Sequence, residues 1–338
     1  MEGFFRALIF LIILLYVIST AQYATLGIEK AASDRAALLS FKSLVDDDPF
    51  GALSSWNNGS LHYCRWRGVS CGGRHPNRVT ALDLKSLRLT GFVSPSVANL
   101  TFLQRIDLSD NMLEGRIPEE LGSLRRLRYL NLSVNSLRGT IASSLGNCSN
   151  LRVLNLRDNK INEEIPPELG YLQKLTWLAL SYNNLTGAIP ATLGNLAQLQ
   201  YLILRFNSFT GSIPYSLGNI SSLIYLSFGK SNLSGPIPPS FGSLLSLKTL
   251  EIQENSLTGT IPSTLANLSS LNHLYLRGNS LQGEIPHFAE LAFLSDLICS
   301  FNDLGEIPIS LDTSSLQTLD LGMNYLTGIP YPFTISHL

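Results

Sequence analysis

Aromatic and basic side chains recur together in the middle of this chain, at positions 24 residues apart. Trp177, Tyr201 and Tyr225 hold the same place in three successive segments. Exposed aromatic rings flanked by arginine are the side chains that dominate protein and peptide binding. We therefore predict a binding surface, called the aromatic patch below. Its nine candidate residues are Arg157, Trp177, Tyr182, Tyr201, Ile203, Arg205, Phe206, Tyr225 and Lys230.

A second interpretation of the same rings needs no ligand. Aromatic side chains on neighbouring strands stabilise one another across a sheet. We favour binding because a solvent-facing apolar patch is costly to leave open. The expected ligand is a peptide or a folded protein surface.

Residues suited to catalysis or metal binding do not gather in the same way. No histidine has a metal-ligand spacing with cysteine or another histidine. We find no phosphate-binding glycine loop, nucleophile elbow or protein-kinase signature. The formal net charge of −1 gives no basic footprint for nucleic acid. We predict a non-enzymatic chain without metal, cofactor or nucleic acid.

The structural elements that position the patch also recur every 24 residues. Asparagine marks each repeat, and Ser231 fills the one gap. Such a period predicts a solenoid. An asparagine amide donates and accepts hydrogen bonds, so a column of asparagines can serve backbone groups buried between coils. The column comprises Asn111, Asn135, Asn159, Asn183, Asn207, Asn255 and Asn279.

Leucines complete the frame L-x-x-L-x-L-x-x-N-x-L-x-G-x-I-P around each asparagine. Alternating leucines such as Leu178 and Leu180 predict a short strand with one buried face, and the residues between them face the other way. The Ile-Pro step favours an extended edge segment. We expect a second short strand beside each main one.

This frame resembles the plant-specific class of leucine-rich repeat. The resemblance implies an α/β-type repeat solenoid, a right-handed superhelix whose parallel sheet lies on the concave face. About eleven repeats fall within residues 79–338, the last one incomplete. The aromatic patch would then lie on the concave face.

The segment before the repeats divides into two parts. Residues 1–21 resemble a signal peptide, with an apolar run at 7–18 and small residues before Ala21; cleavage after Ala24 is an alternative. An uncleaved anchor is the other interpretation, but twelve apolar residues are short for a bilayer. No other long apolar run exists, so we expect no membrane span in the mature chain.

Residues 31–78 resemble the N-terminal cap of plant leucine-rich repeat proteins, in the arrangement W-x7-C-x-W-x-G-V-x-C. Within it we predict a helix from Arg35 to Val45, with Asp34 accepting its first amides. The resemblance implies a disulfide between Cys64 and Cys71. Cys148 and Cys299 lie seven coils apart, too far to pair, and we expect small buried side chains.

Eight N-x-S/T sequons predict glycosylation of a secreted chain. Most fall off the main strand, whereas Asn131 lies on a strand position that we expect to face outward. The sequon residues are Asn58, Asn99, Asn131, Asn147, Asn184, Asn219, Asn232 and Asn267.

The cap and first repeats together resemble plant receptor kinases that sense bacterial peptides, as in Asp34–Lys42, Cys64–Cys71 and Arg78–Leu84. This implies an extracellular ligand-recognition module at the cell surface or in the apoplast, ending before the transmembrane and kinase segments. A co-receptor with a shorter leucine-rich repeat ectodomain is an implied partner. A secreted inhibitor, decoy or scaffold is the alternative. The Arg-x-Arg pair of one class of peptide receptor is absent, because Ile203 and Arg205 stand there.

Overall fold

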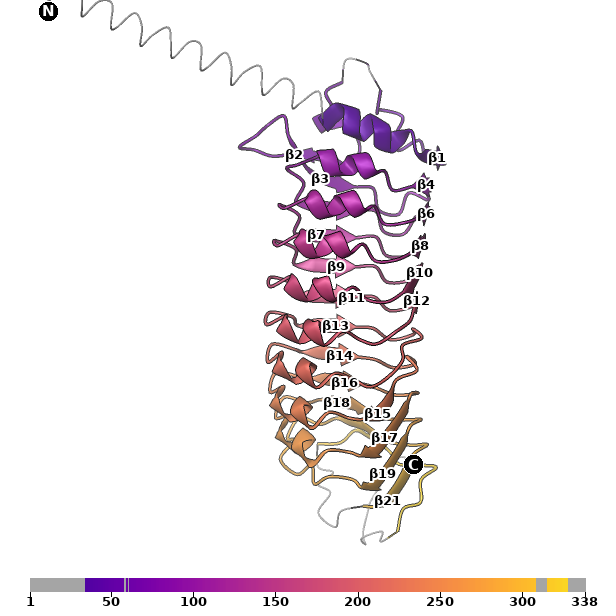
Figure 1. The fold of residues 1–338 in the computed structure, drawn as a ribbon, viewed down its shortest axis with the longest axis vertical. Coiled ribbons are helices and arrows are strands. Elements are labelled where there is room, and N and C mark those ends of the chain that lie inside the picture. Colours follow the sequence, from indigo (N-terminus) through magenta and orange to yellow (C-terminus); the bar gives the residue numbers. More distant parts are fainter. Residues whose placement is uncertain (1–33, 58, 60, 308–314, 328–338) are drawn as a thin grey trace, which may run out of the picture.

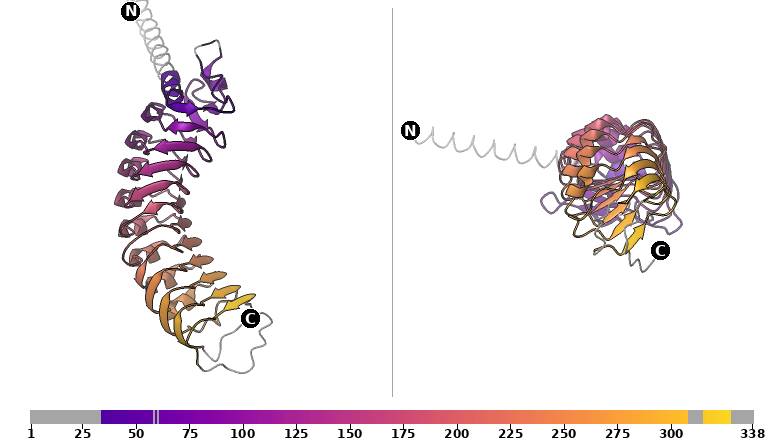
Figure 2. Two further views of the ribbon diagram at one scale, coloured as in Figure 1. Left: turned by 90° about the vertical axis from the view of Figure 1, so that its right-hand side faces the viewer. Right: turned by 90° about the horizontal axis from the view of Figure 1, so that it is seen from below.

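The chain forms one stack of similar coils, seen here in a computed structural model that describes residues 34–57, 59, 61–307 and 315–327. Figure 1 shows the coils following one another from the cap at one end. The stack is curved, with a long sheet along its concave side and short helices along its convex side (Figure 2). The predicted signal peptide and the sequon at Asn58 lie outside the described residues.

The concave sheet contains twelve strands in chain order, all parallel after the antiparallel pair β2 and β3. One strand comes from each coil, so equivalent residues of successive coils lie side by side. The strands are β2 Val69–Cys71, β3 Val79–Asp83, β5 Arg105–Asp107, β7 Tyr129–Asn131, β9 Val153–Asn155, β11 Trp177–Ala179, β13 Tyr201–Ile203, β14 Tyr225–Ser227, β16 Thr249–Glu251, β18 His273–Tyr275, β20 Asp296–Ile298 and β22 Thr318–Asp320.

The predicted second strands form two shorter sheets on one flank of the stack. We call the first of these, which extends from the cap, the lateral sheet. It contains β1 Val45–Asp47, β4 Thr90–Phe92, β6 Met112–Gly115, β8 Ser136–Gly139, β10 Lys160–Glu163 and β12 Asn184–Leu185. The other contains β15 Ser234–Pro236, β17 Ser256–Thr260, β19 Ser280–Glu284 and β21 Asp303–Glu306.

One turn of 3₁₀ helix closes most coils on the convex side. Each begins after the extended residue at the Ile-Pro step or its equivalent, because proline favours that conformation. They are η2 Pro95–Asn99, η3 Glu119–Ser123, η4 Ser143–Asn147, η5 Pro167–Tyr171, η6 Ala191–Asn195, η7 Tyr215–Asn219, η8 Pro239–Ser243 and η9 Ser263–Asn267; η1 Tyr63–Arg65 lies in the cap.

The core is a continuous column of aliphatic side chains inside the coils. The frame leucines of the middle coils, such as Leu178, Leu180 and Leu185, have no exposed surface, whereas Leu319 and Leu321 of the last coil are partly exposed. Each coil buries its apolar side against the next, so one core can serve any number of coils. Cys148 and Cys299 are free and buried in this column, which confirms the expectation for both.

Asparagine side chains bridge neighbouring coils at the end of each main strand. Asn207 Nδ2 donates to the carbonyl of Leu204 at 2.7 Å and to that of Leu180, one coil earlier, at 3.1 Å. Asn207 Oδ1 accepts from the amide of Leu185, also one coil earlier, at 3.1 Å. The ladder therefore serves backbone groups of two coils, as the sequence predicted.

Ser231 serves fewer groups in the next coil. Its hydroxyl donates to two carbonyls at 3.3 Å, and the amide of Phe209 is served by the backbone carbonyl of Ser231. The coil of Phe209 is also where the flank strands stop, leaving a gap between β12 and β15. The break in the asparagine column and the break in the flank sheets thus lie at the same level.

The cap covers the first coil with a helix and a small aromatic cluster. Trp56 and Trp66 are buried and stacked with ring centroids 5.5 Å apart. The disulfide joins Cys64 and Cys71, with Cα atoms 5.5 Å apart, as the resemblance implied.

The predicted extent of the cap helix is wrong at its C-terminal end. Helix covers residues 34–42, and Val45 begins strand β1, which pairs with β4. The apolar side chain of Val45 keeps the spacing of a helix, but pairing with β4, about 45 residues further along the chain, makes this residue part of a strand. Asp34 lies within the helix, and its carboxylate accepts from Arg78 at 2.9 and 3.0 Å and from the amide of Val79 at 2.9 Å. The ion pair lies within the cap, and the bond from the Val79 amide ties the cap to the first repeat.

Glu163 departs from the repeat frame at a position where other coils have glycine. Its φ is +68°, in the left-handed region, which costs a residue with a Cβ about 1–2 kcal/mol. The equivalent Gly139 has φ +81°, and a Cβ there would lie 3.1 Å from Cγ of Arg116. Glycine therefore lets the Arg116 side chain lie across the neighbouring coil.

Replacing Asn207 with alanine should lower the free energy of unfolding by about 2–4 kcal/mol, because buried backbone groups of two coils lose their partners. Urea-induced unfolding measures the change. Ser231→Ala is the matched control in the next coil and should cost clearly less, since it removes only two long hydrogen bonds. Equal losses for the two variants would contradict the role given to the ladder.

Glu163→Gly should raise the free energy of unfolding by about 1 kcal/mol, because the left-handed backbone is less strained without a Cβ. The same urea titration tests it. Gly139→Ala should lower the free energy of unfolding, because alanine is strained at a positive φ and its Cβ would crowd the Arg116 side chain. A destabilising Glu163→Gly change would show that the glutamate side chain supports the fold.

Candidate functional site

The parallel register of the concave sheet aligns the three aromatic residues as predicted. Trp177 pairs with Tyr201, and Tyr201 pairs with Tyr225, on strands β11, β13 and β14. The rings of Trp177 and Tyr201 have centroids 4.5 Å apart, and all three side chains are half-buried. Ile203 lies two residues further along β13, also half-buried.

A second aromatic pair lies where the strands end. Tyr182 and Phe206 directly precede the ladder asparagines and have φ of +56° and +57°. Their rings stack with centroids 4.3 Å apart and planes at 14°. The left-handed turn before each asparagine therefore places these two rings beside each other, next to the first row.

Cations surround the second pair. The guanidinium carbon of Arg157 lies 5.3 Å from the Tyr182 ring centroid, and that of Arg205 lies 5.7 Å from it. Lys230 Nζ lies 5.4 Å from the Phe206 ring centroid. Distances below about 6 Å are attractive cation–π contacts. The structure thus brings the nine predicted patch residues together on one face.

Acidic residues of β16 and its following turn also belong to this surface, and the candidate set omitted them. Glu251 accepts from the Ser227 hydroxyl at 2.7 Å and lies 3.6 Å from Arg205. Glu254 lies 2.9 Å from Lys230. Both glutamates occupy positions of the repeat frame that face away from the core. Comparing the charges at these positions between adjacent repeats could have identified them.

The surroundings of Tyr225 raise the pKa of its hydroxyl above the ordinary value. Burial is the larger cause, and a hydrogen bond with Glu251 adds to it. A tyrosine hydroxyl is already protonated at physiological pH, so this shift leaves its charge there unchanged. Arg157, by contrast, is exposed and has no carboxylate partner among the described residues.

Two polar atoms, one in the patch and one in a nearby coil, are buried without hydrogen-bond partners. They are Nε of Arg205, a donor, and Oε1 of Gln253, an acceptor. Gln253 packs over Gly229, where a Cβ would lie 2.9 Å from its amide carbon. Buried polar groups are nearly always paired in folded proteins. Both atoms lie below the surface, so neither is open to a ligand in this conformation.

The described residues contain no group of three or more His, Cys, Asp or Glu side chains that could hold a metal ion. Within that same part of the chain, no helix has the length and apolar character needed to cross a bilayer.

Most predicted sequons lie on exposed surface away from the patch. Asn99, Asn147, Asn219 and Asn267 end the convex helices, while Asn184 and Asn232 lie on the flank. Asn131 differs from the expectation that it faces outward, because only 8% of its surface is exposed. Its Nδ2 donates to the Tyr129 hydroxyl at 3.3 Å, and its Oδ1 accepts from the hydroxyl of Ser133, its own sequon residue, at 2.8 Å.

In protein secreted from plant cells, Asn131 should carry no glycan, because its attachment nitrogen is enclosed in the fold. Glycopeptide mass spectrometry checks this, with the exposed Asn99 and Asn147 in the same digest as internal comparisons. A glycan on Asn131 of folded protein would show that the Tyr129–Asn131–Ser133 arrangement does not persist.

Family models match much of the chain. A leucine rich repeat N-terminal domain matches residues 31–72. Leucine rich repeat models match residues 149–209 and the stretches 102–124, 126–148, 222–244, 246–268 and 270–290.

Among curated proteins, a putative receptor-like protein kinase of Arabidopsis thaliana is 51% identical over 88 residues, which are 26% of this chain and 8% of that protein. The structure resembles the ectodomain of the Arabidopsis receptor kinase GASSHO1/SCHENGEN3, solved with CASPARIAN STRIP INTEGRITY FACTOR 2. That comparison gives a TM-score of 0.83 and 41% identity, over 87% of this chain and 36% of that one.

A second structural neighbour is the Arabidopsis receptor kinase HAESA, solved with the peptide hormone IDA and the co-receptor SERK1. It has a TM-score of 0.76 and 35% identity, over 87% of this chain and 50% of that one. The chain therefore spans half or less of the length of these relatives. It belongs to the leucine-rich repeat family, and its relatives are plant receptor kinases of that family.

Proposed function

We propose that this chain is the peptide-recognising, non-catalytic part of a plant receptor, and that its aromatic patch holds the ligand. The observation that carries the proposal is the combination, on one concave face, of stacked rings and cations. Rings give contact area, and the exposed Arg157, which has no carboxylate partner among the described residues, gives a charge contact that a ligand can complete.

The chemistry of the patch indicates the kind of peptide. An acidic group or terminal carboxylate suits Arg157, because this cation has no carboxylate partner. The aligned parallel strands give a track on which an extended peptide can lie across several coils. We infer an extended peptide with at least one negative charge.

The comparisons support the same class of ligand. GASSHO1/SCHENGEN3 was solved with CASPARIAN STRIP INTEGRITY FACTOR 2, and HAESA was solved with a peptide hormone. By analogy with HAESA and its co-receptor, we propose that a shorter leucine-rich repeat ectodomain joins the complex. We also propose an extracellular or plasma-membrane location, like that of the receptor relatives.

The test uses peptides that are first selected from a random phage-displayed library for binding to the unaltered chain. Their affinity is then measured for a Trp177→Ala, Tyr201→Ala double variant. Removing two central rings should weaken binding of a selected peptide by about 2–4 kcal/mol, or about thirtyfold or more, in calorimetric titration. Selected sequences should be enriched in acidic residues, because Arg157 is unpaired.

Tyr171→Ala, Tyr215→Ala is the matched control. Both tyrosines are exposed, at 62% and 58%, on the convex helices η5 and η7. This control should bind as the unaltered chain does. Selected peptides that bind the Trp177, Tyr201 variant at full strength would rule out the aromatic patch. A chain that binds a folded enzyme but selects no peptide would favour the inhibitor alternative.

A further inference from the structure

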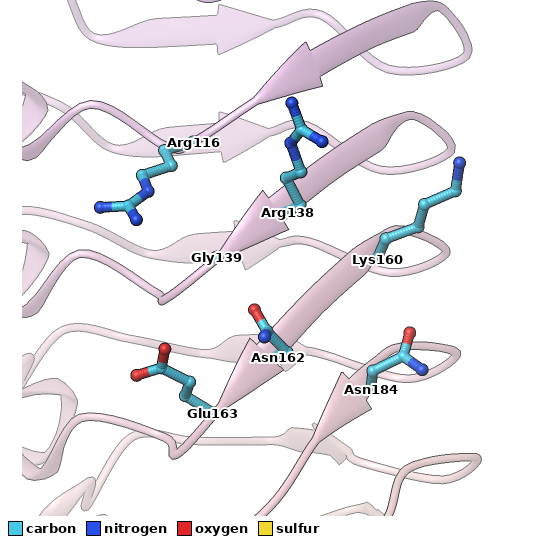
Figure 3. Close-up of a pocket in the computed structure, with 7 residues that line it drawn as sticks. All are labelled: Arg116, Arg138, Gly139, Lys160, Asn162, Glu163 and Asn184. Atoms are coloured by element: carbon cyan, nitrogen blue, oxygen red, sulfur yellow. The ribbon is translucent and has the colours of Figure 1, made fainter.

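A second surface, outside the aromatic patch, gathers three cations around a hollow at the lateral sheet. A shallow hollow of about 450 Å³ opens across four successive coils. Figure 3 shows Arg116, Arg138 and Lys160 extending from neighbouring coils around it, with Asn162, Glu163 and Asn184 on the later coils. Gly139 completes the lining.

The three cations of this hollow are unpaired. Among the described residues, none of them forms an ion pair or a side-chain hydrogen bond. Arg138 and Lys160 are also direct partners in the register of β8 and β10. Like charges placed opposite each other on adjacent strands destabilise a sheet. The flank therefore carries a repulsion that a bound anion would relieve.

Amide groups continue the hollow beyond the cations. Asn162 and Asn184 are direct partners in the register of β10 and β12, and neither side chain has a partner among the described residues. Side-chain amides both donate and accept, which suits the hydroxyl groups of sugars. Cations followed by amides thus form one polar track about 14 Å long over three coil steps.

The lining also indicates what the hollow does not fit. Every lining residue is polar or glycine, with no apolar side chain among the seven. Protein interfaces have an apolar, often aromatic, centre. A hollow lined by charge and amide alone matches a flexible, hydroxyl-rich anion better than the surface of a folded protein.

We infer that this flank binds an acidic polysaccharide, a chain of sugars bearing carboxylates. Its carboxylates pair with Arg116, Arg138 and Lys160, and its hydroxyls bond to Asn162 and Asn184. Glu163 lines the same hollow and opposes the anion, so it limits the affinity. The inference is independent of the peptide proposal, because the two surfaces share no residue.

The probe is an oligogalacturonate long enough to span four coils, titrated against the full chain by calorimetry at low salt. Every protein carries Thr186→Ala, which removes the sequon of Asn184 and keeps its amide. Replacing Arg116, Arg138 and Lys160 together with glutamine should weaken binding about tenfold or more, because three charge contacts are lost. Glu163→Gln should strengthen binding, because the opposing charge is gone.

The matched control replaces Arg152, Lys174 and Lys248 with glutamine. These exposed cations lie outside the hollow, and the change in net charge is the same. Binding should be nearly unchanged in this control. Equal weakening by both triple variants would overturn the inference, since the attraction would then be general.

Three other outcomes would also overturn it. One is no measurable binding of oligogalacturonate to the unaltered chain. Another is equal binding of the fully methyl-esterified oligomer, which lacks the charge. The third is tighter binding of oligoglutamate, which would make an acidic protein segment the occupant.

Discussion

The structure depends on one requirement, which is that backbone groups enclosed between coils need hydrogen-bond partners where water cannot reach. An asparagine in most coils meets it by bonding to its own coil and to the one before, and Ser231 takes its place in one coil. Each bond of this kind is modest in net energy, but leaving the groups unpaired would cost about 1–3 kcal/mol apiece. The ladder therefore fixes the coil-to-coil register along the whole stack.

That register also creates the recognition surface. The turn at the end of each main strand places the residue before the asparagine in a left-handed backbone, as in Tyr182 and Phe206, and Lys230 before Ser231 has the same conformation. These side chains consequently emerge at one height along the concave edge, while Trp177 and Tyr201 stack within the sheet. The scaffold needs only the leucines and the asparagine, so the remaining strand positions are free to carry binding chemistry.

Much of this was predictable because a repeat converts spacing in sequence into spacing in space. The period alone placed the patch residues together, and the ladder and second strands followed from the frame. The disulfide came from a family resemblance. Features that depend on a single distant contact were missed. Val45 joins a strand because β4 is near, and no local pattern reports this. Asn131 was missed for a different, local reason, because Tyr129 and Ser133, each two residues away, bond to its side chain.

The flank hollow was missed for another reason. Arg116, Arg138 and Lys160 hold three different positions in their repeats, so a search for equivalent residues does not group them. The lateral sheet pairs residues 22 apart rather than 24, and this register brings them around one hollow. The same applies to Glu251 and Arg205, which come from different strand positions and meet two coils apart.

The central claim is that recognition takes place on the concave face at coils centred on β11, β13 and β14. Hydrogen exchange of the full chain, with and without a bound selected peptide, tests it most directly. The account predicts slower exchange at these strands and at the turns holding Tyr182 and Phe206, with no change at η5 and η7 on the convex side. Slowing confined to the convex helices or to the cap would contradict it.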